Sequence, residues 1–316
     1  MNTGEETAST QHKLIHGDAR DLSFIPDNSV HLVVTSPPYW TLKKYNDVHG
    51  QLGHVEDYEE FIQELGKVWR ECYRVLVPGG RLVCVVGDVC LSRRDFGRHV
   101  VMQLHSDISV ICRKLGFDNL NPIIWHKISN ASYEVENGSK FLGKPYEPNA
   151  IIKSDIEFIL MQRKPGGYRK PTEIQRAKSR ISKTEFREWF RQIWTLTGAS
   201  TRNHPAPFPE ALANRLIRMF SFYGDVVMDP FSGTGTTMLA ALKANRNSIG
   251  VEIDSSYLEQ AKRRILSEAN KLSNSDHVRV DVYTEPPKVL AFDHNKQPKE
   301  EHLPILAETT GAYGVA

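Results

Sequence analysis

The sequence predicts an α/β protein with a mainly parallel sheet covered by helices on both faces. Apolar, strand-like runs alternate with amphipathic helical segments, as in the helix that starts at Asp57 and the strand at residues 81–88. This alternation is typical of β-α-β units, whose parallel strands are buried on both sides. Residues 121–127 and 156–162 are also strand-like, and no helical pattern separates them. Two strands without a helical crossover predict an antiparallel edge to the sheet.

The helical segments are identified by their apolar period and by the residues at their ends. Asp57 and Glu60 are spaced as a capping box at the start of the first helix. One face of that helix is apolar and is predicted to be core: Phe61, Leu65, Val68, Trp69 and Cys72. Pro78-Gly79-Gly80 ends the unit. Further helices are predicted at residues 99–115, 210–220 and 255–268.

Size and composition limit the classes of protein. A chain of 316 residues holds one sizeable domain and an insertion. The net charge is +2, so only the distribution of charge could indicate nucleic acid. The cysteines form no CxxC pair and are expected to be reduced core thiols: Cys72, Cys84, Cys90 and Cys112. With no signal peptide and no long apolar run, we expect a cytoplasmic protein without a membrane span.

The stretch Val33-Val34-Thr35-Ser36-Pro37-Pro38-Tyr39-Trp40 is a strand that ends abruptly. Pro37 and Pro38 have fixed φ and no N–H, so the strand cannot continue past them. The resulting corner presents polar atoms of Ser36 and Pro37 beside the Tyr39 ring. Such a corner suits a flat aromatic ligand with an exocyclic amine. The plainer interpretations are a proline turn that caps a strand or a Pro-Pro-Tyr ligand for a small domain.

A second stretch, Asp229-Pro230-Phe231-Ser232-Gly233-Thr234-Gly235-Thr236-Thr237, joins a strand to a helix through a glycine turn. Gly233 and Gly235 permit positive φ and let the backbone approach a nucleoside ligand closely. Glu252 ends the next strand, where an acid holds a ribose diol. Asp18 also ends a strand-like run, at the edge where ligands bind in open α/β sheets. No lysine follows the turn, so it is not a phosphate-binding P-loop.

Together these stretches resemble the S-adenosylmethionine-dependent amino-methyltransferases of DNA. Ser36-Pro37-Pro38-Tyr39 is similar to the catalytic motif of that family, and residues 229–237 are similar to its cofactor motif. His204-Pro205-Ala206-Pro207-Phe208-Pro209 is similar to the segment before the cofactor motif. The resemblance covers roughly residues 12–268, with the catalytic motif first, as in the permuted beta group of the family. It implies a Rossmann-like methyltransferase fold.

The resemblance also implies roles for individual residues. The implied catalytic residues are Ser36, Pro37, Pro38 and Tyr39. The implied residues for the cofactor, S-adenosylmethionine, are Asp18, Phe208, Asp229, Pro230, Phe231, Ser232, Gly233, Gly235, Thr236, Thr237 and Glu252. In the family, the position of Asp18 lies near the adenine, and the segment of Phe208 packs over the methionine end. No metal is implied, and His204 is expected to be structural.

Residues 163–191 form a basic stretch with interleaved aromatic side chains, which is what a polyanion-binding insertion needs. A solvated helix face would look similar. Its place between two halves of a methyltransferase core predicts the target-recognition region. The loop from Thr41 to His54 is a candidate lid or DNA-facing loop. The predicted DNA contacts are Lys43, Lys44, Arg169, Lys170, Arg176, Lys178 and Arg180.

The expected organisation is a split core with an insertion. Its parts are a disordered N-terminus (1–11), a catalytic half (12–163, with a loop at 128–153), the target-recognition region (164–194), a cofactor-binding half (195–271) and a partly ordered tail (272–316). The implied partner is duplex DNA, with a cognate restriction endonuclease as a candidate. The chain is expected to be a monomer or a homodimer.

The reaction expected from these motifs is direct methyl transfer to an exocyclic amine of an extruded base. No cysteine follows a proline, so methylation of the cytosine ring carbon is rejected. Serine at the first position of the motif is typical of the N4-cytosine enzymes of the family, whereas asparagine or aspartate is typical of N6-adenine enzymes. N4-cytosine is therefore preferred. The alternatives are an N6-adenine enzyme, a catalytically silent DNA-binding protein, and an RNA or protein methyltransferase.

Overall fold

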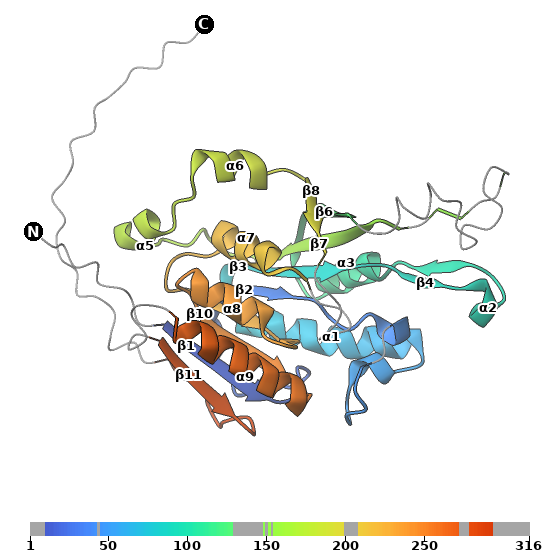
Figure 1. Cartoon of the computed structure of the whole chain (residues 1–316), viewed down its shortest axis with the longest axis horizontal. Helices are drawn as coiled ribbons and strands as arrows, with labels where there is room; N and C mark the ends of the chain where they lie inside the picture. Colours follow the sequence, from blue (N-terminus) through green and yellow to red (C-terminus); the bar gives the residue numbers. More distant parts are fainter. Residues whose placement is uncertain are drawn as a thin grey trace, which may run out of the picture.

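One large sheet organises the computed structural model, which describes residues 10–42, 45–128, 148, 151–152, 154–198, 208–271 and 278–292 (Figure 1). Within these residues the sheet has nine strands in the order β11-β1-β10-β9-β2-β3-β7-β6-β8. The parallel part comprises β11 (Val278–Tyr283), β1 (Thr10–His16), β10 (Asn247–Glu252), β9 (Val226–Asp229), β2 (Val30–Thr35) and β3 (Leu76–Val86). The remaining strands are β7 (Ile156–Arg163), β6 (Asp118–Ile128) and β8 (Ile193–Thr197).

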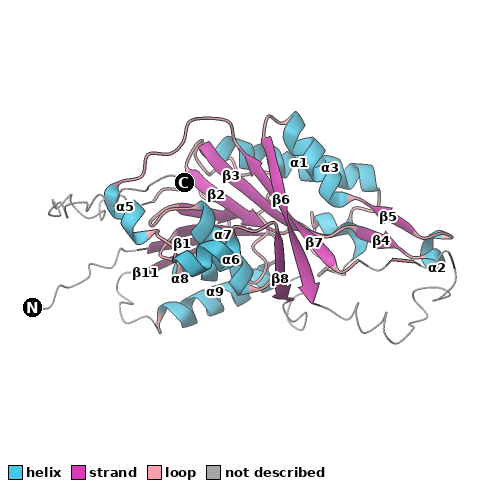
Figure 2. Ribbon diagram, turned by 90° about the horizontal axis from the view of Figure 1, so that it is seen from above, coloured by secondary structure: helices cyan, strands magenta, loops and turns pink. Residues whose placement is uncertain are grey.

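Helices cover both faces of the sheet, as the alternation of segments predicts (Figure 2). The helices on one face are α1 (Tyr58–Val75) and α3 (Leu104–Lys114). Those on the other face are α7 (Glu210–Phe220), α8 (Thr236–Lys243) and α9 (Ser255–Ala269). In β2, Val30 and Val33 pack with the first group, whereas Leu32 and Val34 pack with the second. Four of the six residues of the strand are therefore apolar, because both of its faces are core.

The parallel strands bring distant segments of the chain to one edge. β2 and β9 are neighbours in the sheet, with Leu32 opposite Val227 and Val33 opposite Met228. Both strands run in the same direction, so Ser36 and Pro230 emerge at the same edge, which we call the carboxyl edge. The opposite edge, where β2 and β9 begin, is called the amino edge. The fold thus joins the two predicted motifs before any ligand is considered.

The predicted strand pair is present, and the sheet continues beyond it. β7 pairs antiparallel with both β3 and β6. β8 then pairs parallel with β6 and forms the outer strand on that side. At the other side, β11 lies within the expected tail and pairs with β1. Neither β8 nor β11 is predicted from the sequence.

Two expected boundaries are wrong. β1 begins at Thr10, inside the segment expected to be disordered, because Gln11 N–H donates to the Asn247 side chain and the strand pairs with β11. Residues 99–115 are not one helix. β5 (Val100–Met102) pairs with β4 (Val89–Leu91), and α3 starts only at Leu104.

The basic insertion folds into two short capped helices, α5 (Glu173–Lys178) and α6 (Lys183–Trp189). Ser182 and Glu185 form a capping box at α6, and Trp189 is buried against the core. Arg218 of α7 forms an ion pair with Glu185 and lies over the Trp189 ring. Within the described residues, no helix is long and apolar enough to span a membrane, and no group of three His, Cys, Asp or Glu side chains could hold a metal.

Candidate active site

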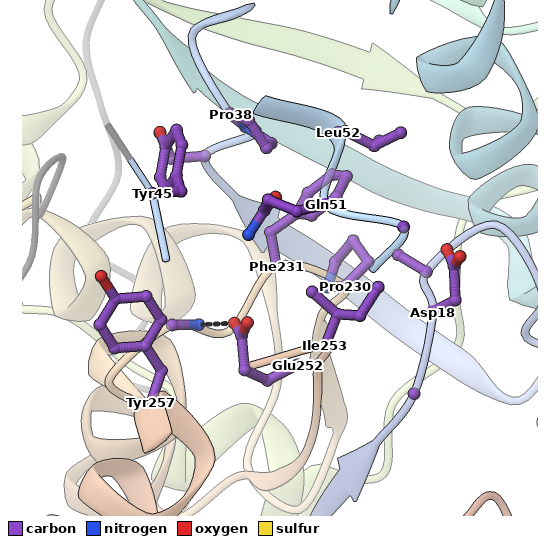
Figure 3. Close-up of a pocket in the computed structure, with 15 residues that line it drawn as sticks. Asp18, Pro38, Tyr45, Gln51, Leu52, Pro230, Phe231, Glu252, Ile253 and Tyr257 are labelled. Carbon is purple, nitrogen blue, oxygen red and sulfur yellow. Dashed lines mark hydrogen bonds between the residues drawn. The ribbon is translucent and has the colours of Figure 1, made fainter. Parts of the chain in front are cut away.

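A pocket at the carboxyl edge brings the two motifs together (Figure 3). Residues that follow four neighbouring parallel strands reach it: Asp18 after β1, Ser36 after β2, Pro230 after β9 and Glu252 at the end of β10. The residues that line the pocket are Gly17, Asp18, Ala19, Ser36, Pro38, Tyr45, Gly50, Gln51, Leu52, Pro230, Phe231, Gly233, Glu252, Ile253 and Tyr257. This is the edge where ligands bind in open α/β sheets.

Glu252 is the buried acid of the pocket. Its Oε2 accepts a hydrogen bond from Gly233 N–H at 2.7 Å (Figure 3). Its Oε1 accepts one from Asp254 N–H at 3.0 Å. Burial raises the pKa of Glu252 to about 7, although these two hydrogen bonds favour the ionised form. A carboxylate in this position can accept hydrogen bonds from ligand hydroxyl groups.

Asp229 binds the two motifs to each other and does not line the pocket. Its carboxylate accepts hydrogen bonds from Thr35 Oγ1 at 2.6 Å, Thr237 Oγ1 at 2.7 Å and Phe231 N–H at 3.1 Å. Thr35 directly precedes Ser36, whereas Thr237 lies in the first turn of α8. Burial raises the pKa of Asp229 to about 6. The residue is therefore a brace between catalytic strand and cofactor turn rather than a ligand contact.

Tyr39 is buried, and its hydroxyl group belongs to a polar chain. Tyr39 Oη donates to Glu157 Oε2 at 3.2 Å, and Lys127 Nζ donates to Glu157 Oε1 at 2.6 Å. Ser36 Oγ lies 3.5 Å from Tyr39 Oη. Burial raises the pKa of Tyr39 well above its ordinary value, and the Glu157 carboxylate adds to this. The phenol thus stays protonated, and Glu157 of β7 fixes the orientation of the ring.

A segment that we call the strap, residues 45–54, passes over the pocket. Asn46 Nδ2 donates to Asp254 Oδ2 at 2.6 Å on one side. Gly50 O accepts from Arg20 Nη2 at 3.1 Å on the other side. Gly50 has φ +85, a conformation that favours glycine. The described part of the predicted loop is thus tied on both sides, and it contributes Tyr45, Gly50, Gln51 and Leu52 to the pocket.

Trp40 fixes the chain between the catalytic motif and the strap. Its φ is +47, which is uncommon for a bulky residue, and the ring is buried. Trp40 Nε1 donates to Val55 O at 2.8 Å, and the ring lies edge-on to Tyr58 with centroids 5.2 Å apart. Unusual backbone of this kind persists only where surrounding contacts hold it, and it clusters at functional sites.

Other predicted cofactor residues lie behind the pocket. Ser232, Gly235, Thr236 and Thr237 shape the turn and the start of α8 without lining the pocket. Gly235 has φ +80, and its Cα faces Ala261 so closely that an added Cβ would lie 2.9 Å from the Ala261 Cβ. Phe208 packs in the core with α7. Residues 204–207 and the predicted DNA contacts Lys43 and Lys44 lie outside the described residues.

The structure does not bring the other predicted DNA contacts to the pocket. Arg169 forms a two-bonded ion pair with Asp225, which directly precedes β9. Ser179 Oγ accepts from Tyr223 N–H at 2.8 Å, close to the same strand start. β9 spans roughly 10 Å from there to Asp229. The neighbouring exposed cations, Lys170, Arg176, Lys178 and Arg180, therefore lie toward the amino edge, as the place of α5 opposite β4 in Figure 1 also shows.

Part of the pocket is not predicted from the sequence. Ala19, Tyr45, Gln51, Ile253 and Tyr257 line it and were not predicted. Ile253 follows Glu252 directly, so an apolar residue after the acid was an available signal. For the strap, only the loop as a whole was singled out from the sequence, because the contacts of its residues depend on ties to Arg20 and Asp254.

The residues present fit a nucleoside-bearing cofactor. Pro230, Phe231, Leu52 and Ile253 supply apolar surface for a flat base, while Glu252 supplies an acceptor for a ribose diol. Gly17 and Gly233 carry no side chain that would fill the space. This geometry defines an α/β enzyme that binds a nucleoside cofactor beside a proline corner.

The protein family to which this enzyme belongs is shown by its similarity to known proteins. Residues 30–263 match the family model N6_N4_Mtase, described as DNA methylase. A relative from Methanocaldococcus jannaschii, named type II methyltransferase M.MjaI, is 41% identical over 78% of this chain and 89% of its own length. The chain therefore belongs to the N6/N4 family of DNA methylases.

Individual relatives differ in what their names say. A protein from Escherichia coli K12 named DNA adenine methyltransferase YhdJ is 31% identical over 80% of this chain and 82% of its own length. A proposed DNA modification methylase from Thermus thermophilus, solved with S-adenosyl-L-methionine, is 55% identical with a TM-score of 0.71; the match covers 86% of this chain and 98% of that one. The cytosine-N4-specific PvuII DNA methyltransferase shares the fold at 20% identity and a TM-score of 0.61 over 85% of this chain and 91% of that one.

Proposed function

We propose that this chain transfers a methyl group from S-adenosylmethionine to the exocyclic N4 amine of cytosine in duplex DNA. The observation that carries the proposal is the meeting of Ser36 and Pro38 with Pro230, Phe231 and Glu252 in one pocket. The Thermus relative with the same cofactor and the family match support it. Serine at the first position of the catalytic motif favours cytosine over adenine.

The cofactor supplies an activated methyl group on a sulfonium, so the protein mainly supplies alignment and electrostatics. In our proposal, Glu252 holds the ribose, Phe231 and Ile253 flank the adenine, and Asp18 lies near its edge. The Ser36 side chain and the Pro37 carbonyl accept hydrogen bonds from the target amine and orient its lone pair. These oxygens also stabilise the positive charge that develops on the nitrogen.

Tyr39 stacks on the extruded base in this proposal, in keeping with the motif. Its phenol is fixed by Glu157, which Lys127 holds in turn. Both partners come from the antiparallel strands β7 and β6, beside the carboxyl end of β3. Glu157 is then a positioning residue, which acts on the base only through Tyr39.

N6-adenine methylation is the second candidate, and the name of the YhdJ relative favours it. The deciding experiment is mass analysis of nucleosides from unmethylated duplex DNA treated with the protein and cofactor. N4-methylcytosine supports our assignment, whereas N6-methyladenine alone refutes it. Parallel reactions with tRNA and with protein test the other substrate classes, and no methyl incorporation into any of them would indicate a catalytically silent binding protein.

We also propose that the chain belongs to the permuted beta group and serves as the modification enzyme of a restriction–modification system. The chain order supports the first point, because the catalytic strand β2 precedes the cofactor strand β9. The type II names of relatives such as M.MjaI support the second. Sequencing the methylated sites of DNA from an unmethylated expression host would define the recognition sequence, and a nuclease that cuts only unmethylated copies of that sequence would identify the partner.

A further inference from the structure

A projecting arm lies beside the pocket, and no sequence motif predicted it. The arm consists of β4, α2 (Arg93–Phe96) and β5, and its strands pair Val89 with Met102 and Leu91 with Val100. It forms a two-stranded sheet separate from the main one and extends away from the body of the protein (Figure 2).

The root of the arm is rigid. Val89 is buried, and Leu91 and Met102 pack against the core on the α1 and α3 side of the sheet. Just before β4, Asp88 Oδ1 lies 2.7 Å from His105 Nδ1, and the His105 ring stacks on Phe158 with centroids 3.8 Å apart. An arm fixed in this way presents its tip in a defined place relative to the sheet.

The tip of the arm is basic and exposes an aromatic ring. Residues 93–99 contain three arginines against one aspartate. Arg93 and Arg98 are exposed, and Phe96 is 51% exposed. A single exposed ring is common on protein surfaces, but this ring stands at the tip of an arm, between two exposed arginines in the sequence. Cations with an interleaved aromatic ring match a nucleic acid, whose backbone is a polyanion and whose bases offer flat faces.

The position of the arm matches the proposed reaction. It leaves the main sheet at the carboxyl end of β3, the strand next to β2, and β4 lies against η1 (Trp40–Leu42), the turn that follows the catalytic motif. A duplex whose extruded base reaches Ser36 must lie over this edge. The cations of α5 lie toward the amino edge, on the far side of the sheet from that duplex.

We propose that the tip of this arm, and not the α5 surface, holds the substrate duplex beside the extruded base. Arg93 and Arg98 pair with phosphates, and Phe96 packs against the bases left exposed when the target leaves the stack. This inference rests on the proposed function, because it takes DNA as the substrate of the pocket. The contacts to phosphate are independent of sequence, so a mixed-sequence duplex is a sufficient probe.

The test compares charge removal at the two edges. The double variant R93Q/R98Q is set against R176Q/R180Q, which removes two exposed arginines from the amino edge. Affinity for a mixed-sequence duplex is measured by fluorescence anisotropy over a range of salt concentrations. We expect about tenfold weaker binding for the arm variant near 0.1 M salt, and a slope of log affinity against log salt that falls by about two. The amino-edge variant should change neither quantity.

A second pair of variants tests the aromatic contact. F96A is expected to lower methyl transfer about tenfold without changing the salt slope, because the ring carries no charge. F186A, which removes an equally exposed ring from α6, should leave transfer unchanged. Melting temperature and S-adenosylmethionine affinity are measured for all variants and should match the wild type. The single variants R93Q and R98Q, each with half the change in slope, replace the double variant if it is unstable.

The outcomes separate this inference from the proposed function. An unchanged salt slope in R93Q/R98Q, or an equal loss in R176Q/R180Q, overturns the role of the arm. If the wild-type protein still methylates DNA in that case, the proposed function stands. A wild-type protein that neither binds the cofactor nor methylates DNA contradicts the proposed function itself.

Discussion

The carboxylate of Glu252 offers the sharpest test of the cofactor pocket. Glu252→Gln keeps the size of the side chain and removes its charge. In the structure both carboxylate oxygens accept N–H groups, from Gly233 at 2.7 Å and from Asp254 at 3.0 Å. A glutamine has one carbonyl oxygen, so its NH₂ group must face one of these two donors. The ligand hydroxyl groups lose a charged acceptor at the same time.

The expected loss follows from these contacts. A hydrogen bond to a charged group contributes about 1.5–3 kcal/mol, so losing one on the ribose weakens binding roughly 10- to 150-fold. The free protein should change less. Removing a buried charge stabilises it, whereas the misdirected NH₂ group destabilises it, and each effect is about 1–3 kcal/mol. We therefore expect a large change in S-adenosylmethionine affinity with a small change in melting temperature.

Titration calorimetry with S-adenosylmethionine, beside a thermal melt, measures both quantities. Glu259→Gln is the matched control, because Glu259 is exposed on α9 and pairs only with Lys262 among the described residues. The control should bind the cofactor like the wild type. Binding by Glu252→Gln within threefold of the wild type, or an equal loss in the control, would refute the role given to Glu252.

Three further predictions test the brace, the position of Tyr39 and the pH dependence of the pocket. Asp229→Asn should change the free energy of unfolding by less than about 1 kcal/mol, because Thr237 can redirect its hydroxyl to Val34 O, whereas Asp229→Ala should lower it by about 2–4 kcal/mol. Urea unfolding measures both values. Weak cofactor binding by a stable Asp229→Asn variant would instead indicate that Asp229 contacts the cofactor directly. Glu157→Ala should lower the kcat of DNA methylation about tenfold in the wild-type background and should have no effect in the Tyr39→Phe background, because Glu157 acts through the Tyr39 hydroxyl. If the kcat losses of the two single variants add up in the double variant, Glu157 does not act through Tyr39. The pKa of Glu252 is raised to about 7 in the folded protein, so between about pH 4.5 and 7 the folded protein holds a proton that the unfolded chain has lost; the stability that this group contributes should therefore fall from pH 5 to 8. Over the same range, affinity for the ribose of 5′-methylthioadenosine should rise, because the carboxylate becomes ionised. Calorimetry in two buffers should detect proton release on binding near pH 6.5, and an affinity that falls over this range would count against the assignment.

The parts of the site that sequence predicted are those encoded by strand ends. Ser36, Pro230, Phe231 and Glu252 each follow or end an apolar strand, and parallel strands carry such residues to one edge. The local pattern was sufficient for them because the sheet itself provides the tertiary contact.

The role of Asp229 was not accessible in the same way. An acid before a glycine turn can face either the ligand or the core. The choice depends on Thr35 and Thr237, whose hydroxyl groups meet it only after β2 and β9 pair. The contacts of the strap were not accessible for a similar reason, since they depend on side-chain ties to the distant residues Arg20 and Asp254.

The elements that were missed are short or half-exposed. In β8, Ile193 is exposed, and in β11 no residue is fully buried. Neither strand therefore has the continuous apolar run of an inner strand. In the arm, the apolar spacing of α3 continues back into residues 99–103, which led to one long predicted helix. The basic stretch at 163–191 was singled out from its composition, but sequence could not show which edge of the sheet it follows.

The most direct test of the whole account is the fate of a labelled methyl group. Purified protein is incubated with unmethylated duplex DNA and S-adenosylmethionine that carries a deuterated methyl group, and the digested nucleosides are weighed by mass spectrometry. We expect deuterated N4-methylcytosine from the wild type and none from a Tyr39→Ala variant that still binds the cofactor. Full methyl transfer by that variant would contradict the claim that the proline corner and the glycine turn form one active site. The same holds if the wild type binds the donor but leaves DNA unlabelled.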